Sequence, residues 1–234
     1  VIAQIEPAFS VNDLSFLYSS EEQGYKALDG ALGAELSKRL AAKGIVMLGY
    51  MEGGFRNMIN NKRPVSVPAD VQGVKYRVMQ NPVFIDMFNN MGGSAVPMAW
   101  GETFTAVQQG TIDGLEIPLD VIEANKYYEV TKFLSLTNHT YSMNGLTMSK
   151  RTLDKLKPEQ RAAVMSAAKS ATAEQRIAAG ADAKKTLSTL EKNGMKINAV
   201  SDVAAFRKSV APVYEKFRQA GNGQLLDMAL AAVK

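Results

Sequence analysis

Cysteine is absent from this sequence of 234 residues, which excludes disulfide frameworks, thiolate metal sites and cysteine nucleophiles. No apolar run approaches the roughly 18 residues that span a bilayer, so we expect no stable membrane insertion. Basic residues form no block longer than pairs such as Lys38-Arg39, so the net charge of +4 does not indicate nucleic-acid binding. No signal peptide is visible and the first residue is not Met, so we expect that an upstream segment has been removed.

Catalytic and metal-binding clusters are also scarce. His139 is the only histidine, which excludes a zinc site built from several histidines, although one histidine could still serve in a Ser–His pair. Glu102, Asp113 and Glu116 allow a paired-carboxylate hydrolase or, with Asn138, an oxygen-ligand metal site. However, Glu102 suits the first turn of a helix, Asp113 suits a turn, and no loop has the spacing of a calcium site. The sequence therefore predicts a protein that is not an enzyme and has no metal or cofactor.

What is present is an alternation of helical and strand-like patterns. Apolar residues make up 46% of the chain, enough for one large core or two smaller ones. Periodicity predicts helices over 20–43, 83–91, 102–109, 120–128, 202–219 and 223–233, and strands or extended segments over 45–50, 74–79, 94–98, 112–116, 133–148 and 195–197. Helices that alternate with buried strands are typical of an α/β fold.

One predicted helix is unusually long. From Lys157-Pro158 to Asn193-Gly194 the chain is rich in alanine and has no internal proline, which predicts a helix of about 36 residues, or about 54 Å. A coiled coil is the alternative, but the apolar positions do not keep a strict heptad. We therefore expect a helix that braces two lobes.

Five spaced motifs carry a family resemblance. They are GVKYRVMQ at 73–80, PMAWGE at 97–102, AVQQGTIDGLE at 106–116, YYEVTKF at 127–133 and LTNH at 136–139. In order and spacing they closely resemble the solute-binding proteins of TRAP transporters (tripartite ATP-independent periplasmic transporters). The resemblance extends over nearly the whole chain.

That resemblance implies a type II-like periplasmic binding protein with two α/β lobes, hinge strands and a long helix that spans both. Lobe I would comprise residues 1–53 and 144–182, and lobe II residues 54–143 and 183–234. Lobe I is expected to be incomplete, because roughly the first 70 residues of the mature family chain have no counterpart here. The resemblance also implies a periplasmic location and delivery of a small organic carboxylate to the membrane permease subunits. A carboxylate sensor or adaptor for a membrane signalling partner is the alternative.

Arg77 is the main candidate for the solute site. An arginine stays protonated and offers a planar fork of donors that matches a carboxylate, and a position near the end of a strand can face a cleft. By resemblance, Arg77 corresponds to the family's carboxylate-binding arginine, Arg56 to a second arginine near the ligand, and Trp100 to an aromatic residue that lines the pocket. A structural salt bridge for either arginine and core packing for Trp100 remain the alternatives.

Ile117 departs from the family pattern, because many relatives have an asparagine there that binds polar groups of the solute. An isoleucine cannot form a hydrogen bond, so an additional polar group of the solute would stay unpaired there. This predicts a monocarboxylate with an apolar or aromatic part rather than a C4-dicarboxylate or a sialic acid. The weaker candidates for the site are Gln80, Asn81, Phe104, Tyr141 and Asn144, each of which could equally be a capping or loop residue.

Overall fold

A single mixed sheet organises the molecule. The computed structural model describes residues 2–233, apart from the side chains of residues 181–183. In the described part, six strands follow the order β3-β2-β4-β1-β5-β6. The strands are β1 (Ile45–Asn60), β2 (Lys75–Val78), β3 (Ser94–Pro97), β4 (Gly114–Pro118), β5 (Phe133–Ser149) and β6 (Lys196–Ala199). Strand β1 is antiparallel to both of its neighbours, whereas every other pair is parallel.

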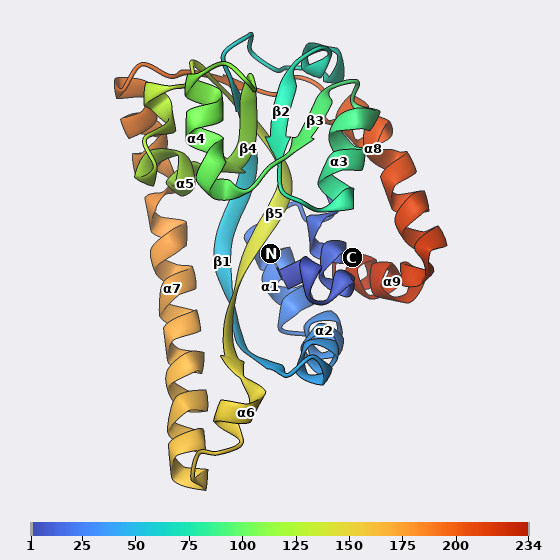
Figure 1. Cartoon of the computed structure of the whole chain (residues 1–234), viewed down its shortest axis with the longest axis vertical. Coiled ribbons are helices and arrows are strands. Elements are labelled where there is room, and N and C mark those ends of the chain that lie inside the picture. The colour runs from blue at the N-terminus through green and yellow to red at the C-terminus, as the bar shows by residue number, and fades with distance from the viewer. Residues whose placement is uncertain (1, 234) are drawn as a thin grey trace.

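Helices cover both faces of this sheet (Figure 1). The α-helices are α1 (Glu21–Leu28), α2 (Ala31–Ala42), α3 (Pro82–Asn90), α4 (Trp100–Gln108), α5 (Leu119–Ala124), α6 (Lys150–Leu153), α7 (Pro158–Lys192), α8 (Val203–Phe217) and α9 (Gly223–Ala232). Shorter turns are η1 (Ile2–Gln4), η2 (Pro7–Asp13), η3 (Pro68–Val71), η4 (Tyr127–Glu129) and the π-turn η5 (Arg218–Asn222). The expected α/β fold is confirmed, because helices and strands alternate along the chain.

Two long strands connect the two ends of the molecule. Strands β1 and β5 pair over almost their whole length, with register shifts between Met47 and Gly49, Glu52 and Gly54, and Arg56 and Met58. Residues 45–52 of β1 run beside α1 and α2 and pair with residues 143–149 of β5, which lead to α6, and the other halves of both strands lie inside the six-stranded sheet (Figure 1). This arrangement fits the hinge strands that the family resemblance implies.

Helix α7 has 35 residues and follows one side of the molecule from α6 to the far end of the sheet (Figure 1). Its bounds agree with the predicted long helix to within a residue or two. Proline at its first position lacks only an N–H that would have no helical partner. At the other end Gly194 takes a φ of +91°, a conformation that glycine adopts without strain.

Three predicted elements differ from the structure by more than two residues. The helix expected over 120–128 ends at Ala124, and the separate 3-10 helix η4 follows it. The helix expected over 20–43 is divided into α1 and α2, because the chain turns at Asp29 and Gly30. At Gly33, a Cβ atom would lie 1.7 Å from the carbonyl oxygen of Leu28, so only glycine allows the two helices to approach so closely. The strand expected over 45–50 continues to Asn60, because register shifts carry β1 past its glycines.

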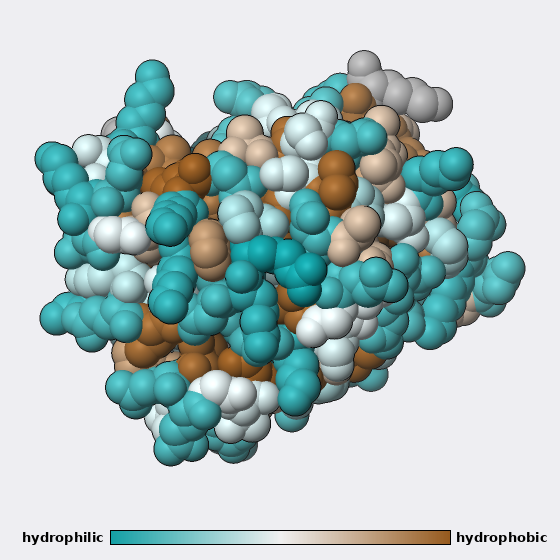
Figure 2. All heavy atoms as spheres, turned by 90° about the horizontal axis from the view of Figure 1, so that it is seen from above, coloured by the Kyte–Doolittle hydropathy of each residue, from teal (hydrophilic) through white to brown (hydrophobic). Residues whose placement is uncertain are grey.

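The buried apolar residues form two clusters. The larger unites α1 and α2 with α3 and α8, and the smaller lies between β4, α4, α5 and the end of α7. Helix α9, which the predicted division assigns to lobe II, contacts α1 and α2; the lobe boundaries therefore stay a prediction. No helix within residues 2–233 has the length and hydrophobicity needed to cross a membrane. Seen from above, the surface carries small hydrophobic patches among hydrophilic side chains (Figure 2), which is usual for a protein surface.

Candidate functional site

Arg77 lies near the carboxyl end of β2 and is buried, with only 4% of its surface exposed. Its Nε atom donates a hydrogen bond to the main-chain oxygen of Met98 at 3.0 Å, and its guanidinium carbon lies 5.6 Å from the centre of the Trp100 ring. Among the described residues, no carboxylate forms an ion pair with Arg77. Burial lowers the pKa of this guanidinium, and nearby Glu116 opposes that change.

Arg56 on β1 is also buried, but its guanidinium is fully engaged. Its Nη2 atom donates to the side chain of Glu116 at 2.8 Å and to the main-chain oxygen of Glu116 at 2.6 Å, and its Nε atom donates to the other carboxylate oxygen. Nη1 donates to the hydroxyl of Ser142 at 3.1 Å, and the Phe84 ring lies 5.2 Å away. A bidentate pair of this kind fixes both position and charge.

His139 completes the charged cluster. Its Nε2 atom lies 3.2 Å from Glu116, and its Nδ1 atom lies 2.7 Å from the hydroxyl of Thr137. Burial lowers the pKa of His139, so the ring is neutral at pH 7 and one tautomer donates to Glu116 while accepting from Thr137. Burial alone would raise the pKa of Glu116, but Arg56 and His139 outweigh it and hold the pKa below its usual value.

The turn before α3 adds a second carboxylate. Asn81 caps α3 through a bond from the Val83 N–H at 3.0 Å, and its amide donates to half-buried Asp13 at 2.6 Å. Burial raises the pKa of Asp13 to about 7, although Arg56 and Asn81 act in the opposite direction. Gln80 is exposed and accepts a long hydrogen bond of 3.3 Å from Gln4.

Aromatic side chains lie beside Arg77. Trp100 is the first residue of α4 and is 42% exposed, so it is not part of the core. Its ring lies 5.7 Å from that of Tyr127, and Phe104, one turn further on, packs 5.4 Å from the same tyrosine. Arg77 and Trp100 are therefore brought together, and the position of Trp100 favours the pocket interpretation over core packing.

Ile117 is buried beside these aromatic residues. It is 2% exposed, lies directly opposite Asn57 on the β1–β4 ladder and belongs to the smaller core cluster. The structure therefore places Ile117 within the sheet, in the cluster that also contains Tyr127 and Phe104, and its contact with the solute stays a prediction.

Tyr141 and Asn144 lie at the hinge instead of beside Arg77. Tyr141 is 2% exposed, and its hydroxyl donates to Glu52 at 2.7 Å; burial and that carboxylate raise its pKa. The Asn144 amide donates to the main-chain oxygen of Glu52 at 3.3 Å. Both side chains serve packing and hydrogen bonding within the β1–β5 ribbon.

The site therefore contains one neutralised arginine and one arginine without a carboxylate. Sequence reasoning considered Glu116 as a possible acid but missed its pairing with Arg56, which is 60 positions away. It also missed Asp13 and the carbonyl group of Met98. The only sequence signal for the role of Glu116 was its position as a polar residue between apolar ones in a short buried strand. That signal did not identify Arg56 as its partner. The supported chemistry is binding of an anionic group at Arg77 beside an aromatic ring.

Comparison with known proteins agrees with this geometry. Residues 1–220 match the profile of DctP, described as bacterial extracellular solute-binding protein, family 7. The chain is 35% identical over 204 residues to the 2,3-diketo-L-gulonate-binding periplasmic protein YiaO of Escherichia coli, covering 87% of this chain and 62% of that protein. It spans 64% and 65% of two further relatives, both called solute-binding proteins, from Chromohalobacter salexigens and Verminephrobacter eiseniae.

Solved structures are similar over their shared length. A TRAP periplasmic solute-binding protein from Sulfitobacter sp. NAS-14.1 with bound β-D-galacturonate is 38% identical, with a TM-score of 0.95 over 98% of this chain and 77% of that one. The sugar acid binding protein DctPAm from Advenella mimigardefordensis with galactonate is 35% identical, with a TM-score of 0.96 over 99% and 76%. The family resemblance, the α/β fold and the periplasmic class that we expected from the sequence are confirmed. Proteins of this family bind solutes and are not catalysts. The chain belongs to family 7 of the bacterial extracellular solute-binding proteins.

Proposed function

We propose that this protein binds a small organic carboxylate, most specifically a sugar acid, and delivers it to the membrane subunits of a TRAP transporter. The observation that carries the proposal is the buried Arg77 guanidinium, which has no carboxylate partner among the described residues and lies beside exposed Trp100. A buried cation of this kind is costly unless a ligand supplies the missing negative charge. A solute carboxylate fits that role, because it accepts two parallel hydrogen bonds from a guanidinium.

The solute would dock on the β2 side of the hinge and be enclosed when the two lobes close. Strands β1 and β5 run through both parts, so rotation at their register shifts would move one part against the other. The relatives are longer than this chain.

Two observations support the proposed solute class. Relatives hold β-D-galacturonate, D-erythronate and galactonate, which are carboxylates rich in hydroxyl groups. The sequence argument for an apolar or aromatic part depended on Ile117, but that side chain is buried in the core. We therefore favour a polyhydroxy monocarboxylate and retain the apolar monocarboxylate as the competing outcome.

Isothermal titration of the full-length protein tests this choice. The panel contains galacturonate, galactonate and erythronate as sugar acids, succinate as a dicarboxylate, and benzoate as an aromatic monocarboxylate. We expect at least one sugar acid to bind more tightly than succinate and benzoate, and Arg77→Ala to abolish its binding. Tighter binding of benzoate would favour the competing outcome. Binding of no carboxylate, or equal binding by Arg77→Ala, would contradict the proposal.

A further inference from the structure

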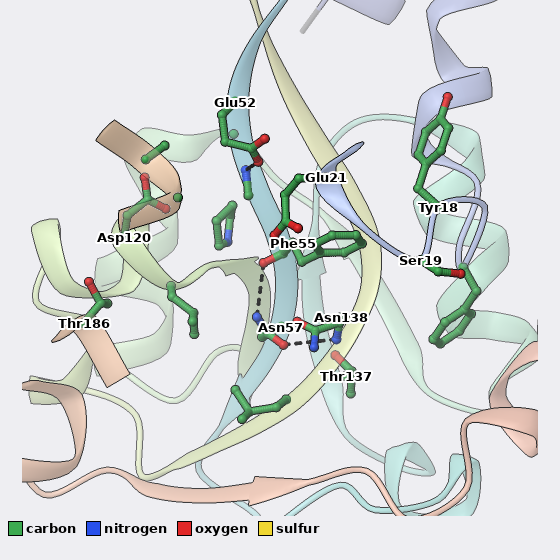
Figure 3. A pocket seen from close by; sticks show the side chains of 18 of the residues that line it. Tyr18, Ser19, Glu21, Glu52, Phe55, Asn57, Asp120, Thr137, Asn138 and Thr186 are labelled. Carbon is green, nitrogen blue, oxygen red and sulfur yellow. Dashed lines mark hydrogen bonds between the residues drawn. The ribbon is translucent and has the colours of Figure 1, made fainter. Parts of the chain in front are cut away.

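A large cavity opens on the same face of the sheet as Arg77. Arg77 lies beside Leu115 in the β2–β4 register. Two positions further along β4, Ile117 lies opposite Asn57 of β1. Because side chains two positions apart on a strand share a face, Arg77 and Asn57 point to the same side of the sheet. On this side lies a cavity of about 890 Å³, which we call the hinge cavity, and Asn57 and Asn138 are among the residues that line it (Figure 3).

Residues 136–139 of β5 form a bulge beside this cavity. The β1–β5 register shifts between Arg56 and Met58, so these four residues of β5 stand opposite the single residue Asn57. Within the bulge, Asn138 takes a φ of +42°, a left-handed conformation that is uncommon outside glycine. Bulges next to binding sites redirect a side chain out of the regular alternation of a strand. Here the redirected side chain that faces the cavity is that of Asn138.

Hydrogen bonds hold the bulge in a fixed shape. The Asn57 side chain accepts from the Asn138 N–H at 3.1 Å. The side chains of Thr137 and His139 are bonded at 2.7 Å, and the main-chain oxygen of His139 accepts from the Phe16 N–H at 2.6 Å. The backbone of the bulge is therefore secured from β1 and from the segment before α1. A binding group that is held in place in this way loses little conformational entropy when it meets a ligand.

The side chain of Asn138 is available to a ligand. It is exposed in the hinge cavity, and its amide forms no hydrogen bond with the part of the chain that the structure describes. An amide offers both donors and an acceptor, which are the groups that a solute hydroxyl needs. Ile117, on the same face of the sheet, offers neither. A hydrogen bond to the solute near Ile117 therefore has to come from a neighbouring strand.

The charges around the hinge cavity favour one end of a sugar acid. Glu21, Glu52 and Asp120 line it (Figure 3), and Arg207 is the single basic residue found there in the described part of the chain. These acidic side chains repel the carboxylate of a solute, but they accept hydrogen bonds from its hydroxyl groups. The carboxylate therefore fits Arg77, and the hydroxyl-rich end fits the hinge cavity.

From this geometry we propose that Asn138 binds hydroxyl groups of the solute, at the end remote from the carboxylate that Arg77 holds. The proposal rests on the function proposed above and names the residue that distinguishes a hydroxyl-rich acid from an apolar one. Strands β4 and β1 lie between Arg77 on β2 and Asn138 on β5. Three strand spacings amount to roughly 14 Å. Because this span is long, a longer sugar acid should gain more from Asn138 than a shorter one.

Removal of the amide without disturbance of the backbone tests the proposal. Asn138→Gly in the full-length protein deletes the side chain and keeps the left-handed conformation, which glycine adopts without strain. Asn138→Asp keeps the size but replaces the donors by a negative charge. The matched control is Asn193→Gly, at an exposed asparagine after α7 that does not line the hinge cavity. Titration calorimetry measures the affinity for erythronate and for the tighter-binding of two longer acids, galactonate and galacturonate, and urea unfolding measures stability.

We expect Asn138→Gly to weaken binding of the longer acid about fivefold or more, the loss of one or more hydrogen bonds, and to weaken erythronate binding by a smaller factor. Asn138→Asp should weaken binding of both acids, because its charge repels them. The control should bind as the parent does, and the urea midpoint of Asn138→Gly should stay close to that of the parent.

Three results would overturn the proposal while the proposed function stands. They are equal affinity of Asn138→Gly and the parent for the longer acid, an equal loss for the longer and the shorter acid, and a loss that Asn193→Gly shares. A parent that binds only erythronate or only benzoate also overturns it. If the parent binds no carboxylate, the proposed function fails, and the role of Asn138 fails with it.

Discussion

Arg56 and Arg77 are two buried arginines of the same sheet, 6% and 4% exposed, and they differ in what neutralises them. Arg56 is held by Glu116 through both carboxylate oxygens, and Asp13 lies within electrostatic reach. Arg77 has a carbonyl oxygen and an aromatic ring but no carboxylate in the described part of the chain.

This difference suggests that the two arginines of the sheet have different roles, one in stability and one in solute binding. A satisfied buried pair holds the structure together, and removal of one partner is expensive. An unsatisfied buried charge weakens the structure and gains its partner only from a ligand. We therefore assign Arg56 to the framework of the site and propose Arg77 as the group that binds the solute.

The largest effect on stability is expected at Arg56. Arg56→Met leaves the fully buried Glu116 carboxylate without its cation, so the free energy of unfolding of the full-length protein should fall by about 3–5 kcal/mol. Urea unfolding followed by circular dichroism measures it. The double variant Arg56→Met/Glu116→Leu should recover most of the loss, because no unpaired charge remains. If the free energy of unfolding of Arg56→Met lies within about 1 kcal/mol of that of the parent, the Arg56–Glu116 pair contributes little to stability.

Arg77→Met should give the opposite pattern. The affinity for the solute should fall at least about 30-fold, equivalent to about 2 kcal/mol, because a buried charge pair with the ligand is lost. The free energy of unfolding without solute should stay equal or rise, because a desolvated charge is removed from the protein. Calorimetry and urea unfolding of the same preparation compare both quantities. A large loss of stability with unchanged affinity would reverse the roles of the two arginines.

Sequence reasoning predicted this molecule well where the information is local. Pro158 and Gly194 bound the long helix, and the alternation around Arg77 predicted β2. At Ile117 it could predict the apolar residue but not its neighbours, because the register that pairs Ile117 with Asn57 depends on strands distant in the sequence. The same holds for the two arginines. The family resemblance predicts that both arginines lie near the solute. The pairing of Arg56 with Glu116 depends on the contact between strands β1 and β4, which the sequence alone does not show.

Asp13 tests whether the framework arginine needs a second carboxylate. The folded-state pKa of Asp13 is raised to about 7 from 3.8, so its contribution to stability is present at low pH and is lost as the pH rises through about 7. His139 acts oppositely: burial lowers its pKa, so stability is lost as the pH falls below its usual 6.5. Each effect is at most about 1.4 kcal/mol per pH unit, the limit for one proton.

Asp13→Asn should therefore stabilise the protein at pH 8 more than at pH 4, because the amide keeps an acceptor for Asn81 and carries no charge to desolvate. Urea unfolding at pH 4, 6 and 8 measures the difference between variant and parent. His139→Gln serves as the comparison, since it should remove the dependence on the acid side. A larger gain at pH 4 than at pH 8 would mean that Asp13 is a stabilising partner of Arg56.

The smallest effect is expected for the contribution of Trp100 to solute affinity. Its ring lies under the Arg77 guanidinium and is 42% exposed, so a solute held by Arg77 would contact the ring as well. Trp100→Ala should weaken solute binding by about 0.5–1.5 kcal/mol, and Trp100→Phe by less, because a phenyl ring keeps part of the stacking surface. Calorimetry gives both values. Stability should hardly change, since the side chain is not part of either core cluster. Equal affinities for parent, Ala and Phe variants would confine the site to Arg77 and would return Trp100 to the role of a cover over the guanidinium.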